Sequence, residues 1–101
     1  RGVRAHTMSS ANVTELRLNG IAMSEGGLNA AIAGMYGVPV ILVTGDDVAV
    51  AETQVIIGNV EGAVVKWARG FHSAQTLTPQ AAQEVIRTRV ASALFTLPKF
   101  E

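Results

Sequence analysis

No charged residue occurs between Gly26 and Gly45, and this stretch limits the possible folds more than any other part of the chain. Its length is close to that of a membrane-spanning helix. However, Asn29 and Pro39 interrupt it, and its first half is rich in alanine whereas its second half is rich in β-branched residues. The sequence therefore predicts a helix followed by a strand that is covered on both faces, and no membrane segment.

The residues around this stretch mark where the helix begins and ends. Ser24 is a suitable N-cap for a helix from Glu25 to about Tyr36, and Gly37 suits a left-handed C-cap. Pro39 prevents the helix from continuing. The continuous apolar run from Val38 to Val43 then predicts a buried strand.

Turn residues divide the rest of the chain in the same way. Val13–Leu18 alternates apolar and polar residues, which predicts a strand with one wetter face. The turn signal Asn19-Gly20 either closes a hairpin with Ile21–Met23 or simply bends the chain. A second helix is predicted from about Asp46 to Ile57, and a third strand from Val60 to Trp67.

The final helix begins at Thr78-Pro79, a hydroxyl cap followed by proline in the first position, and Pro98 is predicted to end it. Arg87 is expected to face outward. The residues expected to face inward are Ala82, Val85, Ile86, Val90, Ala93 and Leu94.

This alternation of strands and helices predicts an α/β fold with a mainly parallel sheet and helices on both faces. Three strands do not bury a two-sided sheet alone. Residues 1–101 are therefore predicted to form a single α/β segment of a larger α/β domain.

The composition indicates that much of the apolar surface of this chain is covered in the complete protein. Hydrophobic residues make up 49% and charged residues only 16%, against about 25% in an ordinary soluble protein. We expect the cover to be more of the same polypeptide or other subunits. Eight basic residues balance eight acidic ones, which gives no reason to expect nucleic acid or an anionic membrane as a partner. The absence of cysteine excludes disulfides and thiolate metal sites, and is compatible with a cytoplasmic protein.

Two residues are the main candidates for chemistry. Glu25 would lie in the first turn of a helix, where the dipole favours its ionised form and makes it suitable as a ligand for a hard cation. Gly26 and Gly27 would then leave room for a metal or substrate, although a simple helix cap and a tight turn explain the same residues. His6 lies in a polar segment and is either an acid, base or ligand, or an exposed loop residue.

Other candidates have weaker support. Asp46 and Asp47 open a helix after a buried strand, so they either bind a metal or cap the helix. Nothing spaced around His72 suggests a site. No G-x-G-x-x-G fingerprint and no H-E-x-x-H motif is present.

The order of these pieces resembles the zinc-dependent D-aminopeptidase family, peptidase family M55. The resemblance rests on three ordered motifs and covers nearly the whole chain: Gly2-Val-Arg-Ala-His6-Thr-Met8, Ser24-Glu-Gly-Gly-Leu-Asn-Ala30 and Gly45-Asp-Asp47. It implies that Glu25 is a zinc ligand, that His6 is catalytic, and that a pair of zinc ions activates water to hydrolyse an N-terminal peptide bond, often beside a D-residue. Together with the low charge, it also implies self-assembly into a homo-oligomer.

The family's other ligands, an Asp-x-Glu and two histidines, have no counterpart here and would lie upstream of Arg1. Because each zinc ion needs about four ligands, the chain is expected to be the central to C-terminal part of such an enzyme and inactive alone. The alternative from another class is a non-catalytic α/β binding or oligomer-assembly module.

Overall fold

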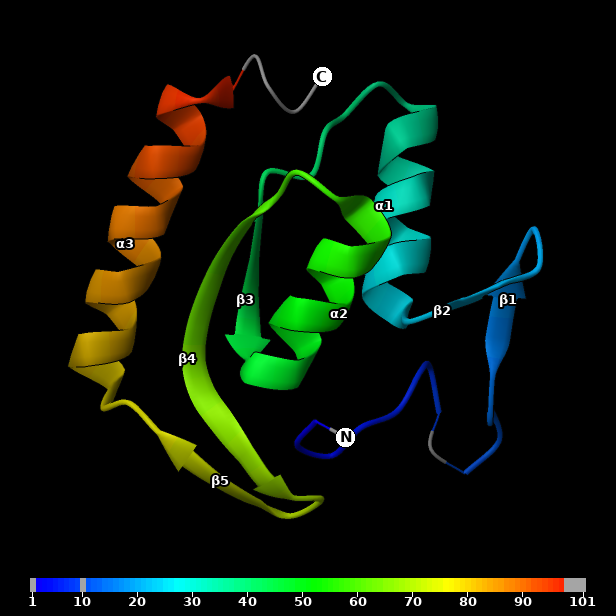
Figure 1. The fold of residues 1–101 in the computed structure, drawn as a ribbon, viewed down its shortest axis with the longest axis horizontal. Helices are drawn as coiled ribbons and strands as arrows, with labels where there is room; N and C mark the ends of the chain where they lie inside the picture. The colour runs from blue at the N-terminus through cyan, green and yellow to red at the C-terminus, as the bar shows by residue number, and fades with distance from the viewer. Residues whose placement is uncertain (1, 10, 98–101) are drawn as a thin grey trace.

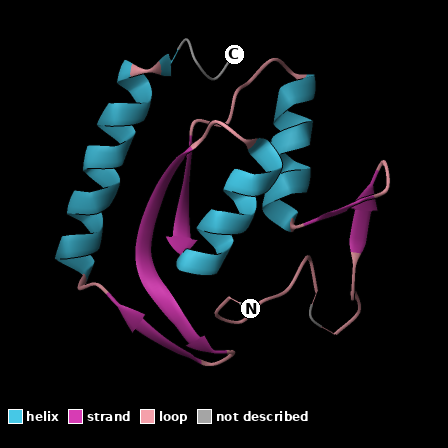
Figure 2. Ribbon diagram, in the orientation of Figure 1, coloured by secondary structure: helices cyan, strands magenta, loops and turns pink. Residues whose placement is uncertain are grey.

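The computed structural model describes residues 2–9 and 11–97, which form a thin slab with extents of 39 × 35 × 17 Å (Figures 1 and 2). The elements follow in the order β1 (Leu16–Leu18), β2 (Ile21–Met23), α1 (Glu25–Met35), β3 (Leu42–Asp46), α2 (Asp47–Ile57), β4 (Glu61–Gly70), β5 (Ser73–Thr76) and α3 (Pro79–Phe95). Among the described residues, no helix is both long and apolar enough to cross a bilayer.

The first two strands form a hairpin on their own. They pair antiparallel, with Leu18 opposite Ile21. Asn19 and Gly20 have φ angles of 52° and 80°, and positive values at both central residues are what a type I′ turn requires. The hairpin alternative is therefore confirmed. However, β1 and β2 form a separate two-stranded sheet and do not join the strands that follow.

The larger sheet is mixed, so the prediction of a mainly parallel sheet is wrong for the described residues. Its order is β3-β4-β5; β3 pairs with β4 in parallel, and β4 pairs with β5 antiparallel. The reason is the short connection at Phe71-His72, because a tight turn joins only antiparallel strands. The strand β5 was not predicted, because its residues Ser73–Thr76 are small or polar and all exposed.

The strand β3 lies later in the chain than the apolar run predicts. It covers Leu42–Asp46, because its pairing with β4 begins at Leu42 opposite Glu61. Thr44, Gly45 and Asp46, which follow the apolar run, thus belong to the strand, although Asp46 was predicted to begin the helix. The carboxyl end of β3 passes directly into α2.

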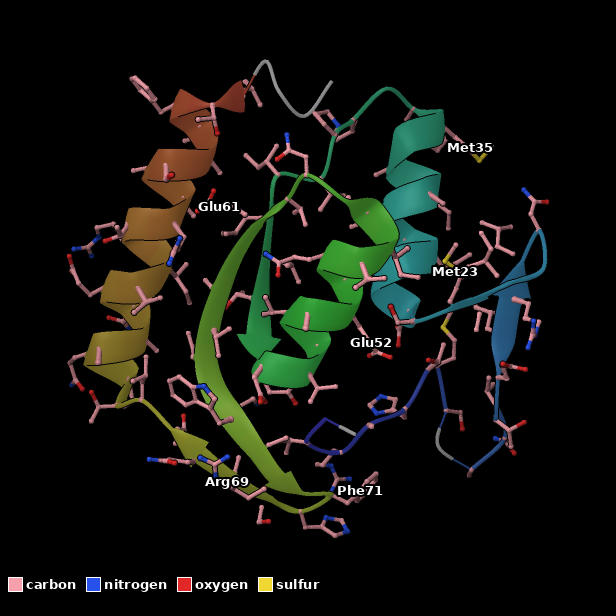
Figure 3. The ribbon with its side chains drawn as sticks, in the orientation of Figure 1. Met23, Met35, Glu52, Glu61, Arg69 and Phe71 are labelled. Atoms are coloured by element: carbon pink, nitrogen blue, oxygen red, sulfur yellow. The ribbon has the colours of Figure 1, made fainter. Side chains whose placement is uncertain are left out.

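Helices α2 and α3 contact opposite faces of β4. A Cβ at Gly62 would lie 2.7 Å from side-chain atoms of Val50 and Gln54, both in α2. The neighbouring Glu61 accepts a hydrogen bond from Arg89 of α3 at 2.9 Å, and Figure 3 shows Glu61 reaching from β4 toward α3. Because successive residues of a strand point to opposite faces, these contacts place one helix on each side.

The described residues form only a small core. The buried apolar residues are Val50, Val60, Ala63 and Ala93. Large apolar side chains remain exposed at Met35 (83%), Tyr36 (80%) and Val55 (84%). The slab therefore leaves much apolar surface for other chain segments or subunits to cover.

The last helix follows its prediction closely, with one exception. Ala93 is fully buried, Arg87 is exposed, and Ala82, Val85, Ile86 and Val90 are half-buried. Leu94, predicted to face inward, is 55% exposed, because the described residues do not cover that side of the last turn. Pro98, predicted to end the helix, lies outside the described residues.

Candidate functional site

Glu25 lies at the start of α1 and faces the segment that contains His6. The cap is Ser24, whose hydroxyl accepts a hydrogen bond from the Gly27 N–H at 3.1 Å. Glu25 is half-buried in the first turn, where the positive end of the helix dipole favours a carboxylate. The Met8 N–H donates a hydrogen bond to Glu25 Oε2 at 3.2 Å. Two of the motifs that the sequence analysis singled out are thus in contact.

Residues 2–9, which we name the histidine loop, are held by three hydrogen bonds that backbone N–H groups of the loop donate to other parts of the fold. The Val3 N–H donates to Asp46 Oδ2 at 2.6 Å, at the end of β3. The Arg4 N–H donates to the Phe71 carbonyl at 2.6 Å, in the turn between β4 and β5. Together with the bond from Met8 to Glu25, these contacts place the loop at the carboxyl ends of β3 and β4, where parallel strands of α/β proteins place their ligands.

The imidazole of His6 is exposed and has a defined tautomer. Its Nδ1 lies 2.7 Å from the Arg4 carbonyl oxygen. Because a carbonyl oxygen only accepts hydrogen bonds, Nδ1 must carry the proton, and in the neutral ring Nε2 is the unprotonated nitrogen. Nε2 makes no hydrogen bond within the described part of the chain, so it is available to accept a proton or to bind a metal.

The histidine loop contains two residues in an unfavourable backbone conformation. Arg4 and Met8 have φ angles of 50° and 64°, a left-handed region that costs a non-glycine residue about 1–2 kcal/mol. Both residues donate one of the backbone hydrogen bonds that hold the loop. Such strain persists only where the surroundings enforce it, and it is concentrated at functional sites.

The acidic pair that follows β3 binds backbone N–H groups. Asp46 is only 5% exposed, and besides Val3 it accepts a hydrogen bond from the Ala49 N–H at 2.7 Å, which makes it the N-cap of α2. Asp47 accepts a hydrogen bond from the Ala68 N–H of β4 at 2.9 Å. The capping interpretation is supported for Asp46, whereas the Asp47 side chain binds β4 instead of capping the helix. Asp46 has an additional contact with the histidine loop that sequence reasoning missed.

The turn between β4 and β5 also contacts the loop, through side chains. Arg4 Nη1 lies 3.2 Å from His72 Nδ1, and because a guanidinium only donates, that nitrogen is the acceptor. The Arg4 guanidinium carbon also lies 5.9 Å from the centroid of the Phe71 ring. The sequence assigned His72 no site, and nothing in its neighbours along the chain indicates this contact.

Gly27 leaves space for helix packing, which corrects the expectation that it makes room for a ligand. A Cβ at Gly27 would lie 3.0 Å from Met23 Sδ and 3.2 Å from Ile56 Cγ2. The missing side chain therefore lets α1 pack closely against β2 and α2 (Figure 3). Gly26 is exposed, and a Cβ there would meet the Thr53 hydroxyl at an ordinary 3.6 Å.

Glu25 and His6 do not make a complete metal site. Within residues 2–9 and 11–97, no three histidine, aspartate or glutamate side chains are grouped closely enough to hold a metal ion. Carboxylate oxygen and imidazole nitrogen are nevertheless usual zinc donors, so the chemistry of the two side chains fits part of such a site.

Comparison with known proteins gives a consistent result. The profile of the M55 peptidase family, described as D-aminopeptidase, matches residues 1–101. A D-aminopeptidase of Bacillus subtilis (strain 168) is 38% identical over 93 residues, which cover 92% of this chain and 34% of that protein. A structure described as the Zn-dependent D-aminopeptidase DppA from Bacillus subtilis, a self-compartmentalizing protease, matches with a TM-score of 0.92 and 35% identity, over 96% of this chain and 35% of that one.

The chain thus spans about a third of the length of these relatives. Its match to the family profile nevertheless covers every residue, including the histidine loop and the start of α1. The chain belongs to the M55 peptidase family of D-aminopeptidases.

Proposed function

We propose that this chain is the part of a zinc-dependent D-aminopeptidase that contributes Glu25 to the metal site and His6 to the reaction. The observation that carries the proposal is the hydrogen bond from the Met8 N–H to Glu25 Oε2 at 3.2 Å. It joins the first turn of α1 to the histidine loop, two residues after His6. The chain alone is inactive in this proposal, because the remaining ligands come from other parts of the complete protein.

The carboxylate of Glu25 is well suited to hold a cation. One oxygen, Oε2, is oriented by the Met8 N–H, while Oε1 has no hydrogen-bond partner among the described residues. Bound zinc would lower the pKa of a water molecule toward neutrality and polarise the scissile carbonyl. Two ions are proposed, since the family resemblance implies a pair.

His6 acts on the proton that hydrolysis of a peptide bond must move. Its Nδ1–H is held by the Arg4 carbonyl, so Nε2 is the nitrogen that takes up a proton and returns it to the leaving amine. The imidazole is exposed, which lets a small peptide reach it. Peptides with an N-terminal D-residue are the proposed substrate class, because the relatives are described as D-aminopeptidases.

Self-assembly is part of the same proposal. The similar structure is described as a self-compartmentalizing protease. In this chain Met35, Tyr36 and Val55 expose large apolar side chains that a subunit contact would cover. We propose a homo-oligomer in the cytoplasm that acts on peptides and binds neither nucleic acid nor membranes.

The test uses the complete protein that contains this segment. We expect the purified protein to contain zinc and to hydrolyse D-alanyl peptides, and Glu25→Ala to lose both metal and activity. Glu84→Ala is the matched control, because Glu84 is an exposed carboxylate of α3 that pairs, among the residues that the structure describes, only with Arg87. A Glu25→Ala protein that keeps the zinc content and turnover of the Glu84→Ala protein would show that the site is wrongly assigned.

The small core favours one alternative, a non-catalytic binding or oligomer-assembly module. Only four apolar side chains are buried in the described part of the chain, whereas twelve large ones are exposed. This alternative predicts a complete protein that assembles but neither binds zinc nor cleaves D-alanyl peptides. Analytical ultracentrifugation beside the zinc assay separates the two.

A further inference from the structure

Asp46 connects the junction of β3 and α2 to the histidine loop. Asp46 is 5% exposed, and each oxygen of its carboxylate accepts a hydrogen bond from one backbone N–H group. Oδ1 accepts from Ala49, in the first turn of α2, and Oδ2 accepts from Val3, in the loop, at 2.7 and 2.6 Å. The two partners are far apart in the sequence, so one side chain fixes the loop relative to the end of β3 and the start of α2.

The loop fits closely around this carboxylate. A Cβ at Gly2 would lie 2.8 Å from Asp46 Oδ2, closer than a real side chain can approach. Gly2 is buried, and its missing side chain is what allows Val3 to reach the carboxylate. The contact is therefore specific to a glycine followed by a free backbone N–H at this place.

Hydrogen bonds along the loop connect the contact between Asp46 and Val3 to the imidazole of His6. Val3 is held by Asp46, and the next residue, Arg4, is held through its N–H by the Phe71 carbonyl. The carbonyl of Arg4 in turn accepts the hydrogen bond from His6 Nδ1 at 2.7 Å. The position and the tautomer of the imidazole thus depend on a backbone segment that Asp46 fixes.

We propose that Asp46 is a positioning residue for His6, in addition to capping α2. The proposal rests on the catalytic role proposed for His6. Asp46 does not touch the imidazole, so it acts by holding the Val3–Arg4 backbone where the Arg4 carbonyl meets Nδ1. A small displacement of a catalytic group is enough to slow a reaction about a hundredfold.

The variant that tests this is Asp46→Asn in the complete, zinc-loaded protein. Asparagine has one oxygen and one NH₂ group, so it accepts a hydrogen bond from Ala49 or from Val3 in this geometry, but not from both. We expect kcat with a D-alanyl peptide to fall roughly 10- to 100-fold, while KM and zinc content stay within about twofold of the unmodified protein.

The control separates positioning from stability. Thr78→Ala removes the N-cap hydrogen bond of α3, where the Thr78 hydroxyl accepts from Ala81 at 3.2 Å, and leaves the histidine loop untouched. We expect Thr78→Ala to keep kcat. Equal kcat values for Asp46→Asn and Thr78→Ala would overturn the proposal.

A second variant keeps the test decisive if Asp46→Asn does not fold. Gly2→Ala places a methyl group against the Asp46 carboxylate, 2.8 Å from Oδ2 and 3.1 Å from Oδ1, and is expected to displace the loop from it. It is expected to lower kcat with zinc content unchanged, and an unchanged kcat would again contradict the proposal. If His6→Ala itself retains full activity, the proposed function of His6 fails; if only His6→Ala is inactive, the inference about Asp46 fails alone.

Discussion

Helices α2 and α3 each begin with a side-chain N-cap, but the surroundings of the two caps differ. The Asp46 carboxylate accepts from Ala49, and the Thr78 hydroxyl accepts from Ala81. Asp46 is buried and also binds the histidine loop, whereas the Thr78 hydrogen bond is exposed and serves only its own helix. A cap identified from sequence therefore reports a helix boundary, and only the packing around it reveals a second task.

The side of the molecule that contains the histidine loop differs from the side that contains α3 in the same way. The starts of α1 and α2 meet the loop that contains His6, through Glu25 and Asp46. On the other side, α3 packs on β4 and its charged residues pair at the surface. We therefore expect substitutions beside the loop to change catalysis, and substitutions along α3 to change stability only.

The largest effect is expected at His6. In the complete protein, His6→Ala should lower kcat about 10²- to 10⁴-fold, the usual contribution of a general acid or base. His72→Ala is the matched control and should lower kcat by no more than about tenfold, because it removes one exposed hydrogen bond to Arg4. Steady-state kinetics with a D-alanyl peptide measures both, and a larger loss at His72 than at His6 would reverse the assignment.

The next largest effect is the loss of stability expected when the N-cap of α2 or of α3 is removed. Asp46→Ala removes the acceptor of two N–H groups and should lower the free energy of unfolding by about 2–4 kcal/mol. Thr78→Ala should lower it by about 1 kcal/mol. Urea unfolding of the complete protein gives both values. Equal losses would mean that the Val3 hydrogen bond adds nothing to stability.

A smaller effect is expected from two glycines of α1. Gly27→Ala should destabilise by about 1–3 kcal/mol, because the new methyl group meets Met23 and Ile56 at 3.0 and 3.2 Å. Gly34→Ala should stabilise by about 0.5–1 kcal/mol, because alanine favours the helix and, beyond the backbone of α1 itself, no described residue lies within 4 Å of the new methyl group. Thermal unfolding distinguishes the two signs. Destabilisation by Gly34→Ala would reveal that another part of the complete protein covers that face.

The smallest effect concerns the ion pairs of α3. Arg87 and Glu84 are 76% and 68% exposed, so Arg87→Ala should change the free energy of unfolding by less than about 0.5 kcal/mol. Arg89 pairs with Glu61, which is only 21% exposed, and Arg89→Ala should cost up to about 1 kcal/mol. A larger loss at Arg87, measured by urea unfolding, would show that α3 is covered in the complete protein.

Local rules predicted the helix starts well. Ser24, Asp46 and Thr78 each cap a helix, and the helices begin at or within one residue of the predicted positions. Gly37, with a φ of 70°, follows α1 as a left-handed residue. Each of these features depends on a few residues that are neighbours in the chain, which is why they can be predicted from the sequence.

Strands were harder to predict because their limits depend on partners. The apolar run Val38–Val43 indicates burial, but pairing with β4 begins only at Leu42. The strand β5 has no apolar pattern, and it exists because the turn at Phe71-His72 returns the chain along β4. The direction of pairing, and hence the mixed sheet, could not be obtained from composition or periodicity.

The candidate site was predicted in part. The motif order pointed to Glu25 and His6, and their assignment to metal and catalysis stays a prediction. The contacts of Asp46 with Val3, and of Arg4 with Phe71 and His72, join residues distant in the sequence and were not predicted. Only a folded chain shows that these residues hold the loop.

The most direct test of the metal assignment is anomalous X-ray diffraction, at the zinc absorption edge, from crystals of the complete protein. We expect a zinc peak about 2.0–2.2 Å from a carboxylate oxygen of Glu25, beside the histidine loop. The account would be contradicted if the zinc ions were bound only by other residues and the Glu25 carboxylate accepted only the hydrogen bond from the Met8 N–H.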